Sequence, residues 1–148
     1  MTSAYVRPDE GRHYPMIDGD HIAKTAVDDA NGRFEVFEVH AHVGPMPPPH
    51  VSPWTSVLYL LDGRVTAVVD GTEYDVEPGG IVTFPAGRPC TFGVVAQPAR
   101  FLAITSGERA GRFFADFASS VPVHRPMEES MAAIRSVTQR HGVAVADA

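Results

Sequence analysis

The fold is decided by one stretch of sequence, GPMPPPHVSPWTSVLYLLDG, at residues 44–63. Its first half contains Pro45 and the proline run 47–49, which cannot donate ladder hydrogen bonds, so we expect a stiff, extended loop. Its second half is an apolar run at 57–61 that predicts a buried strand, and Asp62-Gly63 predicts a tight turn. The stretch therefore predicts a strand that is entered from a rigid loop and left through a turn.

Short strands on both sides of this stretch predict an all-β domain. Residues 33–43 alternate in polarity, as a half-buried strand does. Further short strands are expected at 64–69, 72–76, 81–84, 90–95 and 100–105, separated by segments rich in glycine and proline. Asp62-Gly63 and Asp70-Gly71 read as hairpin turns, so the strands they join are expected to form a meander. Many short strands at regular spacing predict a sandwich or a barrel.

The pattern becomes helical after Gly107. Phe113, Phe114 and Phe117 fall on one helical face, and a second helical run begins after Pro126 and ends at Gly142. We therefore expect one domain over residues 1–148, with a barrel at about 30–106 and a C-terminal helical segment at about 107–142.

Composition excludes several classes of partner. The chain of 148 residues has a formal net charge of −6 and no stripe of Lys and Arg, which argues against nucleic acid. No apolar run approaches the roughly 20 residues of a membrane span, so no membrane partner is expected. Cys90 is the single cysteine, and the N-terminus lacks a signal-peptide pattern, so a cytoplasmic protein is expected. The outward-facing Val57, Tyr59 and Leu61 predict a homodimer.

Two groups of residues carry a resemblance to a known family. Gly44, His50, Ser52, Ser56 and Gly63 resemble the first cupin motif in spacing, and Gly79, Pro85, Ala86, Gly87 and Cys90 resemble the second. The opening around residues 32–34, the turn at 59–63 and the two helical stretches also look like small bacterial quercetinase-like cupins. The resemblance implies a cupin double-stranded β-helix, a jelly-roll barrel with C-terminal helices and a ligand cavity inside.

The same resemblance raises the question of a metal. In cupins the motif positions carry two histidines, a glutamate and a third histidine that bind a transition metal, but here they hold His50, Ser52, Ser56 and Cys90. Neutral hydroxyls are poor ligands, so we expect no cofactor. A divalent transition metal would require a displaced set of His40 and His42 with His50, or with Cys90 in its place, and the strand face of the first two would have to point into the barrel.

The candidate site is a mostly apolar cavity with a polar side. His50 is a candidate catalytic residue because its pKa suits proton transfer near neutrality, and Cys90 is a second candidate, either a functional thiol or a buried small hydrophobe. Trp54 is expected either to stack on a ligand or to form a dimer contact. The candidate substrate-binding residues are His40, His42, Ser52, Trp54, Ser56, Leu58, Leu60, Phe84 and Phe92.

Three functions follow from this cavity. The leading hypothesis is a metal-independent or metal-altered tailoring enzyme, a cyclase or isomerase that acts on an apolar cyclic metabolite such as a polyketide. The first alternative is a quercetinase-like dioxygenase that uses the displaced histidine set. The second alternative is a ligand-binding or sensor barrel without catalysis.

Overall fold

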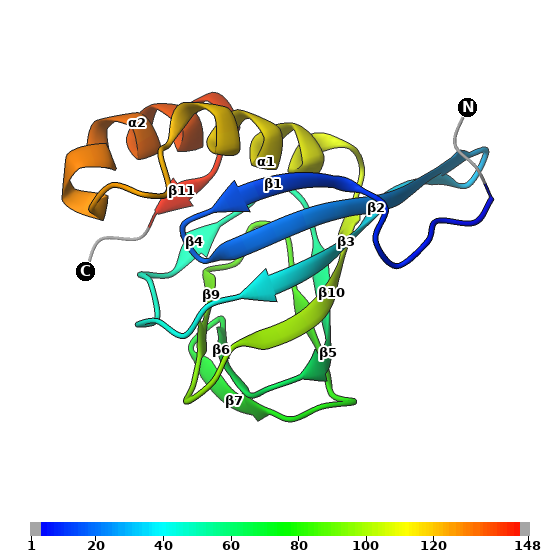
Figure 1. Cartoon of the computed structure of the whole chain (residues 1–148), viewed down its shortest axis with the longest axis horizontal. Helices are drawn as coiled ribbons and strands as arrows, with labels where there is room; N and C mark the ends of the chain where they lie inside the picture. Colours follow the sequence, from blue (N-terminus) through cyan, green and yellow to red (C-terminus); the bar gives the residue numbers. More distant parts are fainter. Residues whose placement is uncertain (1–3, 146–148) are drawn as a thin grey trace.

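The computed structural model describes residues 4–145, so residues 1–3 and 146–148 of the predicted domain lie outside it. In chain order the elements are β1 (Arg12–Met16), β2 (Gly19–Asp29), β3 (Gly32–Ala41), β4 (His50–Val51), β5 (Ser56–Asp62), β6 (Val65–Val69), β7 (Thr72–Val76), β8 (Ile81–Phe84), β9 (Cys90–Val94), β10 (Ala99–Ser106), α1 (Arg109–Ser120), α2 (Met127–Arg140) and β11 (Ala144–Val145). Figure 1 shows the strands wrapped into a barrel whose upper end is covered by the two helices.

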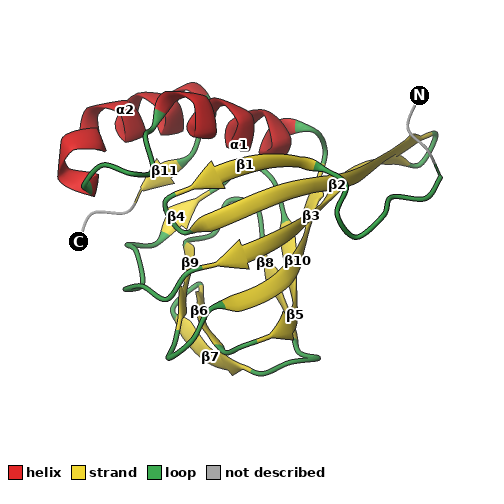
Figure 2. Ribbon diagram, in the orientation of Figure 1, coloured by secondary structure: helices red, strands yellow, loops and turns green. Residues whose placement is uncertain are grey.

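The strands form two antiparallel sheets. The six-stranded sheet has the order β1-β2-β3-β10-β5-β8, and the five-stranded sheet has the order β11-β4-β9-β6-β7. Strands that follow each other in the chain often lie in different sheets, for example β5 and β6. This is a jelly roll, as the sequence predicts, and Figure 2 shows the helices gathered at one end of it.

The predicted hairpin at Asp62-Gly63 is wrong. Strand β5 pairs with β10 and β8, while β6 pairs with β7 and β9, so this turn carries the chain from one sheet to the other. Gly63 adopts a φ of +93°, and a Cβ there would lie 2.8 Å from the Cα of Ala99, so only glycine fits this corner. The hairpin predicted at Asp70-Gly71 is present between β6 and β7.

The sheet also begins earlier than the predicted start of the barrel near residue 30. Strand β2 pairs with β3 from Gly19 opposite Ala41 to Asp29 opposite Gly32, and β1 pairs with β2. Both strands therefore belong to the barrel wall. Gly19 makes this arrangement possible, because a Cβ there would lie 2.2 Å from the carbonyl oxygen of His40.

Two hydrophobic clusters hold the fold together. The barrel cluster lies between the sheets and consists of Phe37, Val39, Ala41, Leu58, Leu60, Val65, Ala67, Val76, Val94, Ala99 and Phe101. The helix cluster fixes the helices to the barrel and consists of Trp54, Ala110, Phe113, Phe117, Val121, Val137 and Val143. Phe114 packs against both clusters, so α1 is anchored directly on the barrel. Neither helix in the described part of the chain is long and apolar enough to cross a membrane.

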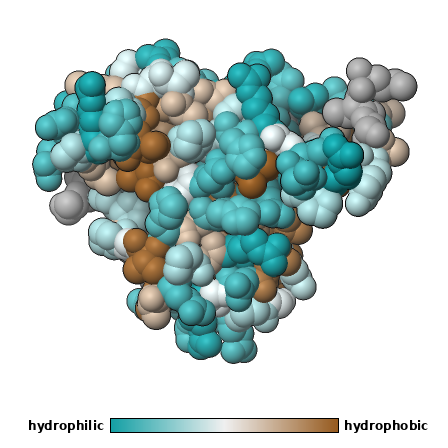
Figure 3. Space-filling view, viewed as in Figure 1, coloured by the Kyte–Doolittle hydropathy of each residue, from teal (hydrophilic) through white to brown (hydrophobic). Residues whose placement is uncertain are grey.

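Several apolar side chains remain on the outer face of the six-stranded sheet. Leu102, Tyr59 and Ile81 lie side by side across β10, β5 and β8, and Ile81 is 63% exposed. On the face seen in Figure 3, hydrophobic residues form separate patches among hydrophilic ones. The homodimer expected from the outward-facing residues stays a prediction.

Candidate functional site

One wall of the candidate site is formed by β4 and β9 of the five-stranded sheet. His50 lies directly opposite Cys90, and alternation along β9 puts Phe92 on the same face as Cys90. The intervening Thr91 points the other way, because its hydroxyl donates a hydrogen bond of 2.8 Å to the carbonyl of Pro47 in the proline loop. Since that loop covers the outside of β9, His50, Cys90 and Phe92 face the barrel interior.

The opposite wall is formed by β5 and β8 of the six-stranded sheet. Ser56, Leu58 and Leu60 alternate with more exposed residues, and Ser56 lies opposite Phe84. Leu58 and Leu60 are almost completely buried in the barrel cluster. The rings of Phe84 and Phe92 lie 6.2 Å apart and so connect the two walls. The fold thus brings together these predicted pocket residues with His50 and Cys90.

Polar residues gather at the end of the barrel nearer the helices. Ser56 begins β5, Thr105 lies opposite it near the end of β10, and β10 leads into α1. His50 and Cys90 pair at the corresponding end of β9, and His21 faces inward from β2. None of these five residues belongs to either hydrophobic cluster, and we call them the polar layer.

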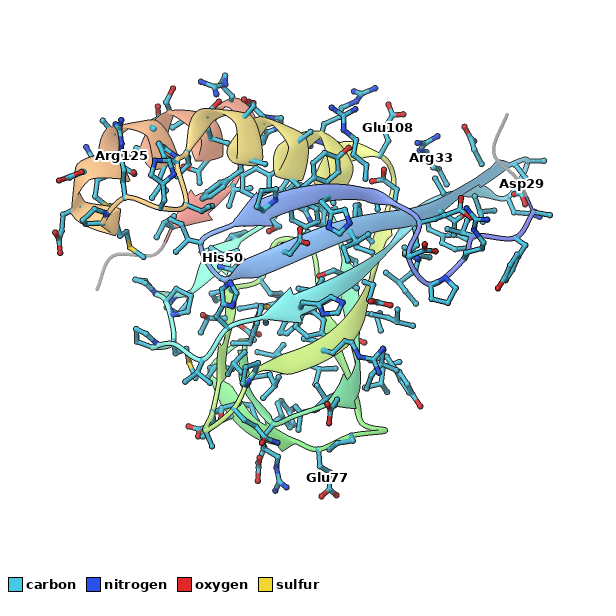
Figure 4. All side chains as sticks on the ribbon, in the orientation of Figure 1. Asp29, Arg33, His50, Glu77, Glu108 and Arg125 are labelled. Atoms are coloured by element: carbon cyan, nitrogen blue, oxygen red, sulfur yellow. The ribbon has the colours of Figure 1, made fainter. Side chains whose placement is uncertain are left out.

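His50 is suited to act as a base. Burial lowers the pKa of its imidazole, while the negative charge of Asp18 and a hydrogen bond to the Pro48 backbone act in the opposite direction. Proline offers only a carbonyl, so the ring donates that bond and its other nitrogen is free to accept a proton. Figure 4 shows His50 on β4, close to the turn between β1 and β2 that contains Asp18. The ring is therefore neutral and proton-accepting at neutral pH.

Cys90 is a neutral thiol in this setting. It is 5% exposed, and burial raises the pKa of the thiol. The Sγ lies 3.4 Å from the carbonyl oxygen of Arg88, to which it donates. A thiol with a raised pKa forms little thiolate, so this environment favours a hydrogen-bonding wall residue over a nucleophile.

The comparisons with known proteins agree with this geometry. The family model described as the cupin domain matches residues 37–105, which run from β3 to β10. Residues 37–105 are a cupin domain. None of the curated proteins compared with it matches its sequence.

Solved structures share the fold of this cupin at low sequence identity. KdgF from a Halomonas species superimposes with a TM-score of 0.64 at 13% identity, covering 75% of this chain and 99% of that one. An RmlC-like cupin from Shewanella frigidimarina gives a TM-score of 0.62 at 12% identity, with 75% and 96% covered. The polyketide cyclase RemF from Streptomyces resistomycificus gives 0.58 at 23% identity, with 71% and 80% covered.

His40 and His42 do not lie in the barrel of this cupin. Phe37, Val39 and Ala41 are the buried residues of β3, so the alternate face with His40 points outward. The Nε2 of His40 lies 2.6 Å from a carboxylate oxygen of Glu38, and both histidines line a shallow outer hollow of about 230 Å³. The displaced ligand set required His40 and His42 to point into the barrel, and they do not. His50, its third member, faces the barrel interior, on the opposite side of the sheet from them.

The residues at the motif positions do not fit a transition metal. They offer one imidazole, one thiol with a raised pKa and two hydroxyls, whereas such metals bind best to several imidazoles, carboxylates or thiolates. Within residues 4–145, no three His, Cys, Asp or Glu side chains are grouped as a metal site requires.

Trp54 has a different role from the two predicted for it. Its side chain is 7% exposed, belongs to the helix cluster and lies 5.6 Å from the ring of Phe113. The C-terminal helices fold back onto the barrel mouth and cover the indole, so it joins helix to barrel within one chain. Ser52 lies on the same loop, where its carbonyl accepts a 3.0 Å hydrogen bond from Gly87 and joins the two motif segments.

Sequence reasoning missed the contribution of β1 and β2. Their inner face carries His21. Tyr14 and Ala23 on these strands line one side of a hollow of about 300 Å³ beneath the first turn of α1. The hollow is lined by Tyr14, Ala23, Arg33, Glu35, Phe37, Glu108, Gly111, Arg112 and Ala115. Figure 4 shows Arg33 and Glu108 close together at its rim. The turn dipeptides Asp18-Gly19 and Asn31-Gly32 are the sequence features from which these strands could have been predicted.

Glu35 links this hollow to α1. One carboxylate oxygen accepts a 3.1 Å hydrogen bond from the backbone N–H of Gly111, and burial raises the pKa of the carboxyl. Gly111 permits this contact, because a Cβ there would lie 2.6 Å from the other carboxylate oxygen. Glu35 therefore satisfies an N–H in the first turn of α1 in place of an ordinary capping residue.

Proposed function

We propose that this cupin binds an apolar cyclic metabolite, such as a polyketide, between its sheets and catalyses a proton transfer that drives cyclisation or isomerisation. The observation that carries the proposal is His50, a half-buried imidazole with a lowered pKa on a mostly apolar inner surface. The likeness in fold to the polyketide cyclase RemF supports the choice of substrate class by analogy alone.

The polar layer supplies the groups that such a reaction needs. The free nitrogen of His50 takes a proton from a carbon next to a carbonyl group, and the electron pair of the broken C–H bond moves onto the carbonyl oxygen. The Ser56 hydroxyl stabilises that oxygen by donating a hydrogen bond. The protonated His50 then returns its proton to another carbon of the substrate, which restores the neutral imidazole.

The apolar walls hold the substrate in a reactive position. Phe84 and Phe92 present aromatic surface from opposite sheets, and the helices cover the nearby end of the barrel. A ring packed against this aromatic surface loses little further freedom when the proton moves, and water is kept from competing for the base.

Carbon-bound proton exchange tests the proposal without knowledge of the natural substrate. The probe is 2-tetralone, a fused cyclic ketone, incubated in D₂O and followed by proton NMR. We expect the protein to accelerate exchange next to the carbonyl beyond the same concentration of imidazole. His50→Gln should reduce this acceleration by at least about tenfold, since general-base catalysis supplies factors of this size or more.

His40→Gln is the matched control, because it removes an imidazole from the outer face of the barrel. Equal exchange rates in the wild type and His50→Gln would contradict the assignment of the base. Saturable binding of 2-tetralone without accelerated exchange would favour a ligand-binding barrel over an enzyme.

Metal analysis separates the proposal from the oxygenase alternative. Protein purified without chelators or a His tag is analysed by plasma mass spectrometry, together with His50→Ala. Near-stoichiometric metal that disappears in the variant would overturn the metal-independent mechanism. Metal well below one ion per chain in active protein is the expected result.

A further inference from the structure

We propose that His21 is a second ligand-binding residue of the barrel, whose Nδ1 hydrogen-bonds an oxygen on the side of the ligand away from His50. This inference rests on the proposed function, because it names a feature of the substrate of the same site. The ligand class is thereby narrowed to an apolar ring system with a hydroxyl or carbonyl group opposite the reacting carbon.

His21 is held firmly at the inner face of β2. It is 6% exposed and lies between Tyr14 of β1 and Val39 of β3 in the sheet. Its ring packs at 4.6 Å from the ring of Phe114 in α1. Sheet and helix therefore fix the position of the imidazole before any ligand arrives.

The Nδ1 of this buried ring lacks a hydrogen-bond partner among residues 4–145. Buried polar atoms in proteins are nearly always paired, and an unpaired one costs stability. The histidine is therefore expected to meet a polar atom that the chain itself does not supply.

A ligand oxygen suits this nitrogen better than a lone water. A buried water usually makes about three hydrogen bonds. The side chains placed next to His21 by register and stacking are Tyr14, Val39 and Phe114, of which only Tyr14 carries a polar atom. An apolar ligand held by packing requires one partner for its single oxygen, and His21 provides it.

His21 lies on β2 between the hollow beneath α1 and the turn near His50. The hollow of about 300 Å³ includes Ala23 and Phe37, the neighbouring inward-facing pair on the same two strands. On the other side, Asp18 in the turn before β2 is close enough to influence the pKa of His50. His21 therefore lies on β2 between the turn that influences His50 and the residue that lines the hollow.

The test compares two probes that differ in one polar group, 2-naphthol and 2-methylnaphthalene, by NMR titration. We expect the wild type to prefer 2-naphthol, and His21→Phe to weaken 2-naphthol binding about three- to tenfold while changing 2-methylnaphthalene binding much less. His21→Asn, which places an amide near the position of Nδ1, should restore part of the preference. His40→Phe is the control for an imidazole on the outer face.

The ratio of the two affinities cancels any general loosening of the fold by the substitutions. An unchanged ratio in His21→Phe would overturn the role of His21 while leaving the exchange experiment on His50 unaffected. Absence of binding by both probes in the wild type would count against the barrel site itself. If His21→Phe fails to fold, the same ratio is measured in His21→Leu, and a ratio equal to that of the wild type would contradict the proposal.

Discussion

The two ends of the barrel interior differ in chemistry although the same strands build both. Along β5, Ser56 stands at one end and Leu60 near the other, and along β9 Cys90 stands at one end and Val94 at the other. At the apolar end the side chains close the space between the sheets. At the polar end the helices and β1 lie over the barrel. The difference suggests that one end of the barrel supplies stability and the other is available for chemistry.

The largest effect should come from breaking the apolar end. Leu60→Ala removes a side chain that is 0% exposed and leaves a cavity, so we expect the free energy of unfolding to fall by about 2–5 kcal/mol. Ser56→Ala on the same strand should change it by less than about 1 kcal/mol. Urea denaturation measures both. Similar losses for the two variants would contradict the division between the ends.

The second effect concerns the helices that cover the polar end. Asp116 of α1 accepts hydrogen bonds from Arg140 of α2 and from His141 and Ser120. The bonds from Arg140 and then from His141 hold the pKa of Asp116 well below its usual range. Asp116→Asn should therefore lower the melting temperature by about 2–4 °C at pH 7, measured by circular dichroism.

The pH dependence of Asp116 provides its control. A carboxyl with a depressed pKa stabilises the fold above the pKa of the unfolded state, and this contribution is lost as the pH falls below about 4. The gap between wild type and Asp116→Asn should narrow in that range. A gap that stays constant down to pH 2 would show that the charge of Asp116 is not what joins the helices.

The third effect concerns Glu35, where the hollow meets α1. Burial raises the pKa of its carboxyl, so the folded state holds the proton more tightly and stability declines as the pH rises above about 4.5. At pH 7 Glu35→Gln keeps an oxygen for the N–H of Gly111 without the buried charge, so it should be neutral or slightly stabilising. Glu35→Ala should cost about 1 kcal/mol because that N–H loses its partner. Equal losses for both variants in denaturant titrations would contradict this account.

Much of the fold follows from local patterns in the sequence. The strands from β5 to β10 and both helices lie where alternation, turn dipeptides and helical spacing predict them. The partners of those strands do not follow, because a turn such as Asp62-Gly63 looks the same whether it closes a hairpin or crosses between sheets. Pairing is decided by contacts between distant residues, such as Gly63 with Ala99.

The candidate site was also predicted only in part: local patterns placed some of its residues, and contacts between distant residues decided the others. Motif spacing and alternation gave His50, Cys90, Ser56 and the apolar wall residues their inward positions. Alternation alone could not say which face of β3 points inward, so His40 and His42 were placed among the candidates. His21 was missed because the turns around β1 and β2 were not interpreted as hairpins. Trp54 depends on how the helices fold back, which no local pattern specifies.

The smallest effect should be the contribution of His50 to stability, and it tests whether the polar end is buried as the fold implies. Burial lowers the pKa of His50, so below the unfolded value of about 6.5 the unfolded chain binds the proton more readily than the folded chain does. Wild-type stability should therefore fall between pH 8 and pH 5 relative to that of His50→Gln, as measured by urea denaturation. Parallel curves for the two proteins would mean that water reaches the imidazole freely, and the polar layer would then be an open surface instead of an enclosed site.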